Sequence, residues 1–495
     1  MKRYFWALAA VCATTSMATA QDLLTLDAFL GQVKNAPVYR SSSETVEALL
    51  LQKEEPDLAY STKLVGHAKR NDNRDDQVLT TLYDGNELNE LIHRAKTDDY
   101  GASLVKKWKY GFTTALNYDW TRVDSTADSG QSTAFQVQPS ASVTLPLWRD
   151  FLGKQSRAQT DQTRYQTESS QFSAAHQREE WLCQARTAYW NLQLARDSVA
   201  IRRDTLARAV SIVAWSQRRS NLRLGDDTEI IQARATQRVR ELELQQASES
   251  AKTACIDFNR LRGVEDEEVH ETLERLETSL AGLKFNWPQI APRRWDVKAS
   301  EAQVEAKKAA WKAAKADAQP DLNAFASIAS NGADSSYTPA NDESAKVRRP
   351  NSTIGVELTI PLDVMATRKV AKGYERNYKA ALLEFEDKVL QTQQEWKHLH
   401  QRLNDVDQRL GMAKEIEALQ KEKVEKEQQR LRAGRTTQYQ VQSYEGDYSS
   451  ARLQYLSIQA EKLSLWAEGE WILSAEREWI RSAKSEEAAW TEGVK

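Results

Sequence analysis

The stretch FQVQPSASVTLPL at residues 135–147 decides the fold of this chain. Apolar residues occupy almost every odd position from Phe135 to Leu147, and small polar residues stand between them. A period of two predicts a β-strand with one apolar and one polar face. The last five residues, VTLPL, recur as LTIPL at 358–362. A long polar run follows each copy and ends in Leu-Arg-x-Gly, at Gly225 and at Gly434, so one strand-and-helix unit occurs twice.

A further strand precedes each of these two strands. Residues 112–120 alternate in the same way and lead into 135–147 across a polar loop at 124–132. In the second copy, residues 322–330 precede 354–362. The sequence therefore predicts two strand hairpins, which give four strands per chain.

If these hairpins span a membrane, their apolar residues face lipid and the polar residues between them face water. The predicted lipid-facing positions are Phe112, Leu116, Tyr118, Val143, Leu145, Val356, Leu358 and Ile360. The predicted water-facing positions are Asn117, Asp119, Ser142 and Thr144. Trp108, Trp120 and Trp148 stand near strand ends, where either an aromatic belt at the membrane interface or packing against helices would place them.

Long helices follow the hairpins. Residues 154–221 contain neither proline nor glycine, so they can form one helix of about 100 Å at 1.5 Å per residue. Residues 368–432 predict a helix of almost the same length. After each Leu-Arg-x-Gly, where glycine can end a helix, a returning helix is expected at 228–262 and at 437–470. The chain thus contains two antiparallel helical hairpins.

Shorter segments complete the assignment. Residues 22–55 predict a helix that begins after Thr25 and ends at Pro56. An Ala- and Lys-rich helix is expected at 296–315. Between Pro56 and Trp108 the pattern supports only one strand, at 60–69.

Composition favours long solvated helices over compact cores. Of the 495 residues, 40% are hydrophobic and 28% are charged. The formal net charge of −3 points neither to nucleic acid nor to an anionic membrane surface. Residues 1–20 predict a signal peptide, with Lys2 and Arg3 before an apolar stretch and Ala-Thr-Ala before the cleavage site. Beyond it no run of eighteen apolar residues occurs, so any membrane crossing is expected to use strands.

The order of these elements resembles the TolC family of outer-membrane efflux proteins. The residues that carry the resemblance are the TLDAF stretch from Thr25 to Phe29, Asn-Ala-Pro at 35–37, the two strand ends and the two Leu-Arg-x-Gly turns. Each motif is weak alone, but their order extends over most of residues 22–475. The sequence is thus similar to this family over nearly its whole mature length.

The resemblance implies a passive exit duct for efflux or type I secretion in the outer membrane of a Gram-negative bacterium. Its fold would be mainly α with β: a homotrimer whose twelve strands, four per chain, form one β-barrel, continued by a long antiparallel α-helical tunnel in the periplasm. Four strands cannot close a barrel alone, since the smallest membrane barrels need about eight. The implied partners are outer-membrane lipid, a periplasmic adaptor and an inner-membrane transporter, with no cofactor and no nucleic acid.

The resemblance also places the adaptor-docking tip and the tunnel entrance at the two glycine turns. The tip residues carried over are Leu222, Leu224, Gly225, Asp227, Leu431 and Gly434. Where the best-known family pattern has aspartates in the entrance ring, alignment on Gly434 gives Gln440 and Ser443 as gate candidates. An acidic gate is therefore not carried over to this chain.

Four segments organise the chain. Residues 1–20 are the signal peptide. The first repeat, 21–285, contains the N-terminal helix, the strand hairpin near 108–147, the helical hairpin 154–262 and a connector. The second repeat, 286–475, contains a helix, the strand hairpin near 321–362 and the helical hairpin 366–470. Residues 476–495 form a C-terminal tail. Four tryptophans lie close together in the tail and just before it, and no role is assigned to them: Trp466, Trp471, Trp479 and Trp490.

No pattern in the sequence points to catalysis or to a metal. Phosphate-loop, dinucleotide, zinc-protease and nucleophile-elbow motifs are absent from it. His398 and His400 are two residues apart on a predicted helix, so they point to different sides and are expected to be solvated. A disulfide between Cys183 and Cys255 is the less favoured alternative to two free thiols.

Two other classes of function stay open beside the duct. A periplasmic coiled-coil adaptor or scaffold would need no alternating strands. An enzyme would need a constellation of catalytic residues that the sequence does not display.

Overall fold

The structure is a computed structural model. It describes residues 23–492 apart from 75–76, 84–85, 128–129, 223–226, 284, 286 and 349; at 77–83, 86–93 and 476–492 it describes the backbone only. The chain divides into two compact units, which we describe separately. The sheet unit consists of Thr45–Ala174 and Trp295–Leu390, and the helical unit of Met1–Glu44, Ala175–Arg294 and Gln391–Lys495.

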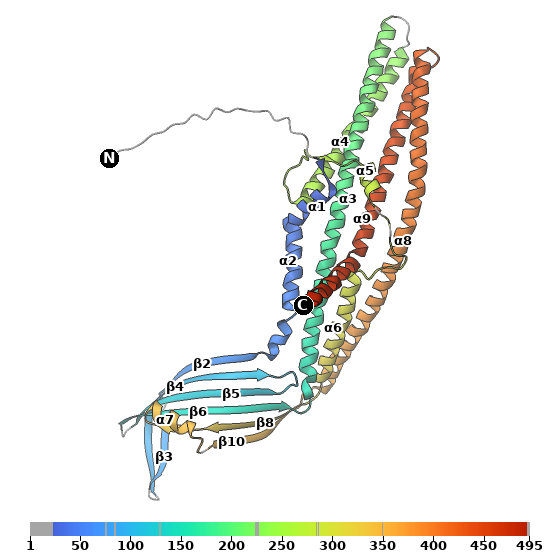
Figure 1. The fold of residues 1–495 in the computed structure, drawn as a ribbon. Helices are drawn as coiled ribbons and strands as arrows, with labels where there is room; N and C mark the ends of the chain where they lie inside the picture. Colours follow the sequence, from blue (N-terminus) through green and yellow to red (C-terminus); the bar gives the residue numbers. More distant parts are fainter. Residues whose placement is uncertain are drawn as a thin grey trace, which may run out of the picture. The chain divides into compact units, whose positions relative to one another are not determined.

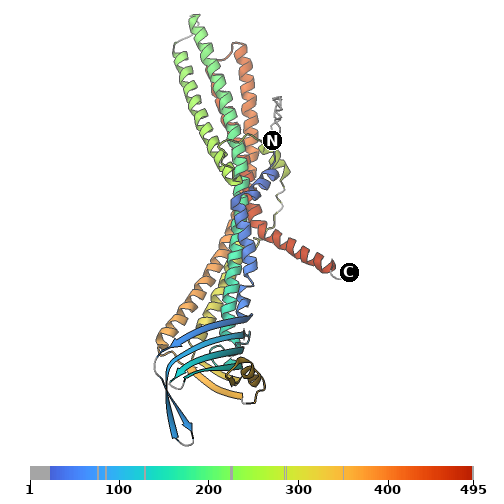
Figure 2. The same ribbon diagram turned by 90° about the vertical axis from the view of Figure 1, so that its left-hand side faces the viewer.

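One eight-stranded sheet dominates the sheet unit (Figure 1). Its main path runs in the order β10-β8-β6-β5-β4-β2, β3 pairs with β4, and β9 pairs with β6. The described strands are β2 (Thr62–Asn73), β3 (Gln77–Tyr83), β4 (Asn86–Lys107), β5 (Thr113–Ala127), β6 (Gly130–Pro146), β8 (Asp321–Ser330), β9 (Gly332–Asp334) and β10 (Pro350–Thr359). Neighbouring strands of the path are antiparallel, and the sheet is curved (Figure 2).

The two predicted strand hairpins are confirmed as β5–β6 and β8–β10. The loop expected at 124–132 is wrong, because β5 continues to Ala127 and β6 starts at Gly130. Polar side chains there bond across the strands: Ser125 and Ser132 share a hydrogen bond of 2.7 Å, and Thr133 donates to Asp124 at 2.8 Å. Cross-strand bonding thus extends the hairpin through residues that the composition assigns to a loop.

The sheet contains more strands than the four of the two predicted hairpins, because β2, β3, β4 and β9 join it. The number of strands that each chain gives to a barrel stays a prediction. The strand predicted at 60–69 is confirmed in β2, whereas β4 was not predicted. Charged residues interrupt the apolar alternation near the C-terminal end of β2 and in the middle of β4. These charges pair between strands, so strand pairing persists where the apolar pattern fails.

A short helix occupies the connection between β8 and β10. This helix, α7 (Tyr337–Ala345), packs against β6 and β9. The Ser330 hydroxyl donates to the carbonyl of Ser344 at 2.6 Å. Gly332 leaves room for the α7 backbone, since a Cβ there would lie 2.6 Å from the Ser344 nitrogen. The alternating pattern leaves residues 331–351 as a plain loop between the two strands, but in the structure this region contains a folded cap on the sheet.

The predicted long helices are confirmed as continuous elements. α3 covers Lys154–Asn221 and α8 covers Val364–Arg432, and α8 passes through Gly373 and Gly411 without a break. The returning helices are α4 (Asp227–Arg262) and α9 (Gln438–Glu492). The predicted end of the last helix near residue 470 is wrong, because α9 continues to Glu492. No helix in the described ranges has both the length and the apolarity to cross a membrane.

Shorter elements fill the rest of the two units. The expected helix 22–55 is two helices, α1 (Leu26–Asn35) and α2 (Pro37–Gln52), because Pro37 interrupts it. Thr25 caps α1 as predicted: its hydroxyl accepts from the Ala28 nitrogen at 3.3 Å. The remaining elements are β1 (Leu23–Leu24), η1 (Glu55–Tyr60), η2 (Phe151–Gly153), β7 (Thr272–Leu273), α5 (Leu276–Gly282) and α6 (Trp295–Asp317).

The main core of the helical unit forms around α1 and the short strand β1. Phe29 of α1 is fully buried and stacks on Phe258 of α4, with ring centroids 4.1 Å apart. The buried Tyr189 hydroxyl donates to the Leu24 carbonyl at 2.6 Å and accepts from the Glu274 nitrogen at 3.0 Å. The short parallel pair β1–β7 is thereby fixed to α3.

Candidate functional site

One face of the sheet is apolar across all six strands of the main path. Strand register places Leu64, Leu104 and Leu116 in one row, and Val143 in the row that continues to Ala326 and Ile354. Large side chains of this face are exposed in several strands, with 73% of Leu64, 59% of Leu116 and 85% of Ile354 accessible, whereas Val137 of β6 is buried. We call this side the apolar face. An apolar surface of this extent marks a contact with lipid or protein.

Aromatic residues flank the exposed aliphatic zone at both ends of the strands. At the end next to the helices, Trp108 stacks on Phe112 at 5.3 Å, and Trp148 is 51% exposed. At the other end, Tyr100 stacks on Trp120 at 4.4 Å. From residue 112 to residue 120 a strand rises about 26 Å at roughly 3.3 Å per residue. Membrane barrels carry an apolar band of about 25 Å between two aromatic girdles, which is the same scale.

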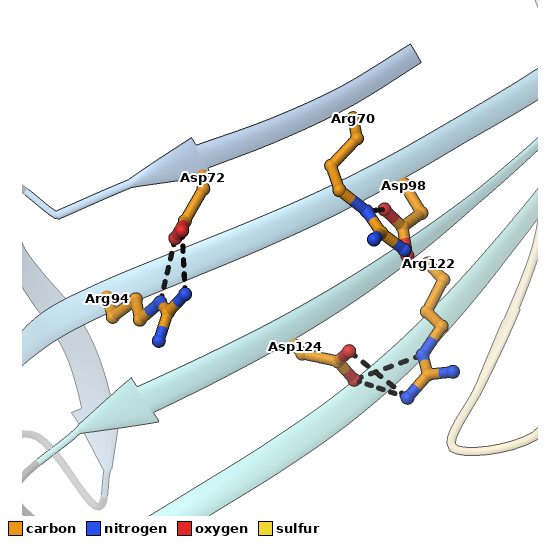
Figure 3. Close-up of polar contacts among 6 residues, drawn as sticks. All are labelled: Arg70, Asp72, Arg94, Asp98, Arg122 and Asp124. Carbon is orange, nitrogen blue, oxygen red and sulfur yellow. Dashed lines mark hydrogen bonds and ion pairs between the residues drawn. The ribbon is translucent and has the colours of Figure 1, made fainter. Parts of the chain in front are cut away.

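Beyond Tyr100 and Trp120 the same face becomes charged (Figure 3). Each of three arginines pairs with an aspartate: Arg70 with Asp98, Arg94 with Asp72, and Arg122 with Asp124. Arg94 donates from Nε to one carboxylate oxygen of Asp72 at 2.7 Å and from Nη2 to the other at 2.6 Å. Arg70 binds Asp98 in the same bidentate way, and Asp98 is buried. A bidentate pair holds the two strands in one position relative to each other and also stabilises them.

These charges form a checkerboard over β2, β4 and β5. Register aligns Arg70, Asp98 and Arg122 in one row, and Asp72, Lys96 and Asp124 in the next. Opposite charges therefore face each other across every strand boundary in both rows. The sequence contains a signal for this charge arrangement, because a basic residue two positions before an aspartate recurs at 70–72, 96–98 and 122–124.

The opposite face of the sheet is polar. Asn117 donates to the Ser140 hydroxyl at 3.1 Å, and the Thr121 hydroxyl donates to Asp99 at 3.1 Å. His67 lies 3.7 Å from Asp99 and 3.8 Å from Asp119. We call this side the polar face.

The predicted strand positions mostly fall on the side expected from their alternation. Register puts Leu116, Val143, Leu145, Val356 and Leu358 on the apolar face, and Asn117, Asp119, Ser142 and Thr144 on the polar face. Three other predicted positions either lie just outside a strand or contact α7. Phe112 and Ile360 lie one residue outside β5 and β10, and the Tyr118 hydroxyl bonds to Tyr337 and Asn341 of α7.

The second glycine turn has the geometry expected of a helix stop. Gly434 has φ 69°, the left-handed conformation that glycine adopts at little cost. Its nitrogen donates to the Leu431 carbonyl at 2.9 Å, and the Arg435 nitrogen donates to the Arg430 carbonyl at 2.9 Å. This pair of bonds is a Schellman motif, which ends α8. Thr437 then caps α9 through a 3.3 Å bond from the Gln440 nitrogen.

Only part of the first turn is described. Leu224 and Gly225 lie outside the described residues. Leu222 follows α3 and is 69% exposed. Asp227 starts α4 and accepts from the Ser220 hydroxyl at 3.5 Å.

A groove of about 740 Å³ separates the ends of the two helical hairpins within the helical unit. Trp215, Arg219, Glu229, Leu431 and Tyr439 are among the residues that line it. Arg219 packs on the Trp215 ring at 4.8 Å and pairs with Glu229 at 3.7 Å. The structure thus brings Leu431 and Gly434 of the predicted tip to the wall of one groove.

The two gate candidates are exposed on α9. Gln440 donates from its amide to the Tyr444 hydroxyl at 3.1 Å, and Ser443 has an accessible side chain. The role of these two residues in a tunnel entrance stays a prediction.

The cysteine and histidine candidates lie on the long helices α3, α4 and α8. Cys183 and Cys255 are free, and burial raises the pKa of the Cys183 thiol to about 11. His398 is exposed as expected, whereas His400 packs against Trp396 at 4.7 Å, so the prediction that it is solvated is wrong. Among the described residues no group of His, Cys, Asp and Glu has a metal-binding arrangement.

The C-terminal tryptophans that can be described are packing residues. Trp466 makes an edge contact with Trp190 at 6.2 Å, and Trp471 lies 5.1 Å from His176. The side chains of Trp479 and Trp490 lie outside the described residues.

Comparison with known proteins gives a consistent result. Residues 287–467 match the family of outer membrane efflux proteins. No curated protein matches the chain by sequence. Among solved structures, the outer-membrane channel OprN is 14% identical at a TM-score of 0.63, over 90% of this chain and 89% of that chain. VceC from Vibrio cholerae is 14% identical at a TM-score of 0.61, over 90% and 95%.

CusC, whose structures describe transmembrane channel formation, is 13% identical at a TM-score of 0.63, over 90% of this chain and 91% of that chain. At these identities the structural matches establish the fold. The predicted resemblance to TolC-like channels is confirmed by sequence in the second repeat and by fold along the chain.

Proposed function

From the premise that this chain has an outer membrane efflux protein domain and the fold of TolC-like channels, we propose that it is the outer-membrane exit duct of an efflux or type I secretion system. The observation that carries the proposal is the exposed apolar face between two aromatic zones. A soluble adaptor or scaffold would have no use for this face, because water would contact Leu64, Leu116 and Ile354.

The sheet forms part of a barrel wall in this proposal. The apolar face contacts lipid, and the polar face lines a wet lumen through which cargo passes. The chain acts as an assembly of identical copies, because its open sheet needs further copies to close in lipid. The number of three copies is taken from the resemblance to the TolC family. Transport through it is passive, and an inner-membrane transporter supplies the energy.

A periplasmic adaptor docks at the helical hairpin ends. The groove beside Gly434 offers Trp215, Leu431 and Tyr439 as apolar contacts and an Arg219–Glu229 pair as a polar contact. Leu222 and Asp227 stand exposed at the neighbouring turn. Such a groove suits a helical partner that inserts an amphipathic face.

Cell fractionation and an export assay test the duct. We expect the protein in the outer-membrane fraction after detergent extraction, and accumulation of the exported compound in cells that lack the gene. A periplasmic protein that separates from membranes in salt would contradict the proposal.

The tip assignment has its own test in Gly434→Val. No atom lies within 4 Å of a Cβ built at this glycine, so the replacement costs energy through the backbone alone. A β-branched residue at positive φ costs about 1–2 kcal/mol, which disturbs the Schellman turn. We expect reduced capture of the adaptor by crosslinking and reduced export, with normal protein amount in the outer membrane.

Gly434→Asn is the matched control, since asparagine tolerates the left-handed conformation. Its export should stay near that of the unmodified protein. Equal export by the valine and asparagine variants at equal protein level would reject the tip assignment.

A further inference from the structure

The sheet ends in two strands that have a neighbour on one side only. Within the described residues, β2 pairs with β4 alone and β10 pairs with β8 alone. We propose that the free edge of β2 pairs with β10 of a second copy of this chain, so that each copy contributes six wall strands. Three copies would then close an eighteen-stranded barrel instead of one of twelve strands. This inference rests on the proposed function.

The β2–β4 hairpin has the length of a wall element. A membrane-crossing strand needs about 9–11 residues. β2 has 12 residues and β4 has 22, while the predicted strands β8 and β10 have 10 each. All six strands of the path are therefore long enough to cross.

The hairpin also continues the two faces of the sheet without a break. On the apolar face Leu64 lies opposite Leu104, which lies opposite Leu116. Farther along, the checkerboard joins Arg70 to Asp98 and aligns both with Arg122 of β5 (Figure 3). If the β2–β4 hairpin folded away from the rest of the sheet, the row of leucines would be exposed to water. The charged residues of β4 would also lose their alignment with Arg122 of β5.

Strand directions favour closure through these two edges. Each neighbouring pair in the path is antiparallel, and the path contains an even number of strands. β2 and β10 therefore run in opposite directions. If β10 of one copy lies beside β2 of the next, the new pair is antiparallel like all the others, and copies can repeat around a ring.

Both edges have side chains suited to a shared wall. On the apolar face, Leu64 of β2 and Val356 of β10 are 73% and 70% exposed, as lipid-facing residues would be. On the polar face, β2 has Lys63 and Lys69, and β10 has Glu357. Opposite charges across a strand boundary favour pairing. Open backbone edges at membrane depth are not tolerated, so these edges require a partner.

The strand number determines the width of the exit. Barrel diameter grows roughly linearly with the number of strands, so eighteen strands would give a diameter about half again that of twelve. Barrels of 16–18 strands can hold a water-filled channel. The β2–β4 hairpin would thus widen the outer opening for cargo.

Cysteine pairs test the interface. In a chain with Cys183→Ala and Cys255→Ala, one cysteine is placed at Lys63, Val65, His67 or Lys69 of β2, and another at Thr353 or Glu357 of β10. All these positions lie on the polar face, and the scan samples several registers. A mild thiol oxidant is added to intact cells. We expect at least one of the pairs to give covalent trimers on a denaturing gel.

The matched control uses Asn117→Cys of β5 with the same β10 positions. β5 has neighbours on both sides within its own chain, so this pair should stay monomeric. Covalent trimers from the β5–β10 pairs would overturn the inference and restore twelve strands. The absence of crosslinks from every β2–β10 pair would overturn it as well.

Strand counting in electron microscopy images of the purified protein gives an independent answer. Eighteen strands per ring support the inference, and twelve overturn it. Fractionation of the same cells keeps the two proposals apart. A twelve-stranded trimer in the outer membrane refutes only the strand number, whereas a protein that leaves the membrane in salt refutes the duct.

Discussion

Leu116→Arg is expected to remove most of the assembled protein from the outer membrane, whereas Asn117→Arg should leave assembly nearly unchanged. Leu116 lies on the apolar face between Leu104 and Ala141, and 59% of it is exposed. An arginine on the lipid side near the bilayer midplane costs about 2–4 kcal/mol. The next residue along the strand, Asn117, faces the polar side, where the new charge stays hydrated.

Two measurements check this pair. The amount of heat-modifiable oligomer in outer-membrane extracts reports assembly, and urea titration of the refolded protein in lipid vesicles reports stability. We expect a large loss in both for Leu116→Arg and a change within about 0.5 kcal/mol for Asn117→Arg. If both variants assemble equally well, the apolar face does not contact lipid.

The repeated strands and long helices were predictable because each follows one simple period. Alternation near Leu116 and Val143 gave β5 and β6, and the absence of helix breakers in residues 154–221 gave the bounds of α3. The glycine stop at Gly434 followed from its place after a helix. Local rules were sufficient for these elements.

The added strands could not be predicted from apolar alternation, since charges interrupt the pattern. Arg70 and Asp72 occupy apolar-face positions in β2, and each is satisfied by a partner from β4. Such pairing depends on residues more than twenty positions apart, which a local window does not detect. The same limit applies to α7, where Gly332 and Ser330 accommodate a helix inside an expected loop.

The candidate site was predicted only in part. Single residues such as Leu431 and Gly434 were found from the repeat, but the groove between the two hairpin ends requires their packing. Trp215 and Tyr439 lie outside the repeated motifs, so nothing in the sequence marked them. Likewise, His400 was misjudged because Trp396 covers it from the preceding turn of its own helix.

Phe29→Ala is expected to destabilise the helical unit by about 3–5 kcal/mol. Phe29 is fully buried, stacks on Phe258 and lies 5.7 Å from the Tyr189 ring. Truncation to alanine leaves a cavity between α1 and α4, which packing around fixed helices cannot fill. This residue ends the TLDAF stretch that begins with the capping Thr25, so the stretch both starts α1 and packs it against α4.

Hydrogen exchange with mass spectrometry on the purified protein locates this loss. We expect faster exchange in α1, in β1 and β7, and in the parts of α3 and α4 around Tyr189 and Phe258. Strands β5 and β6 belong to the sheet unit and should keep their exchange rates.

Leu23→Ala is the matched control, because Leu23 precedes the same helix but is 59% exposed. Surface truncations of this kind usually change stability by less than about 0.5 kcal/mol. A cavity in the core predicts a difference of several kcal/mol between the two variants. Equal exchange in both would mean that Phe29 does not hold α1 in place and that the cluster around Phe258 is stable without it.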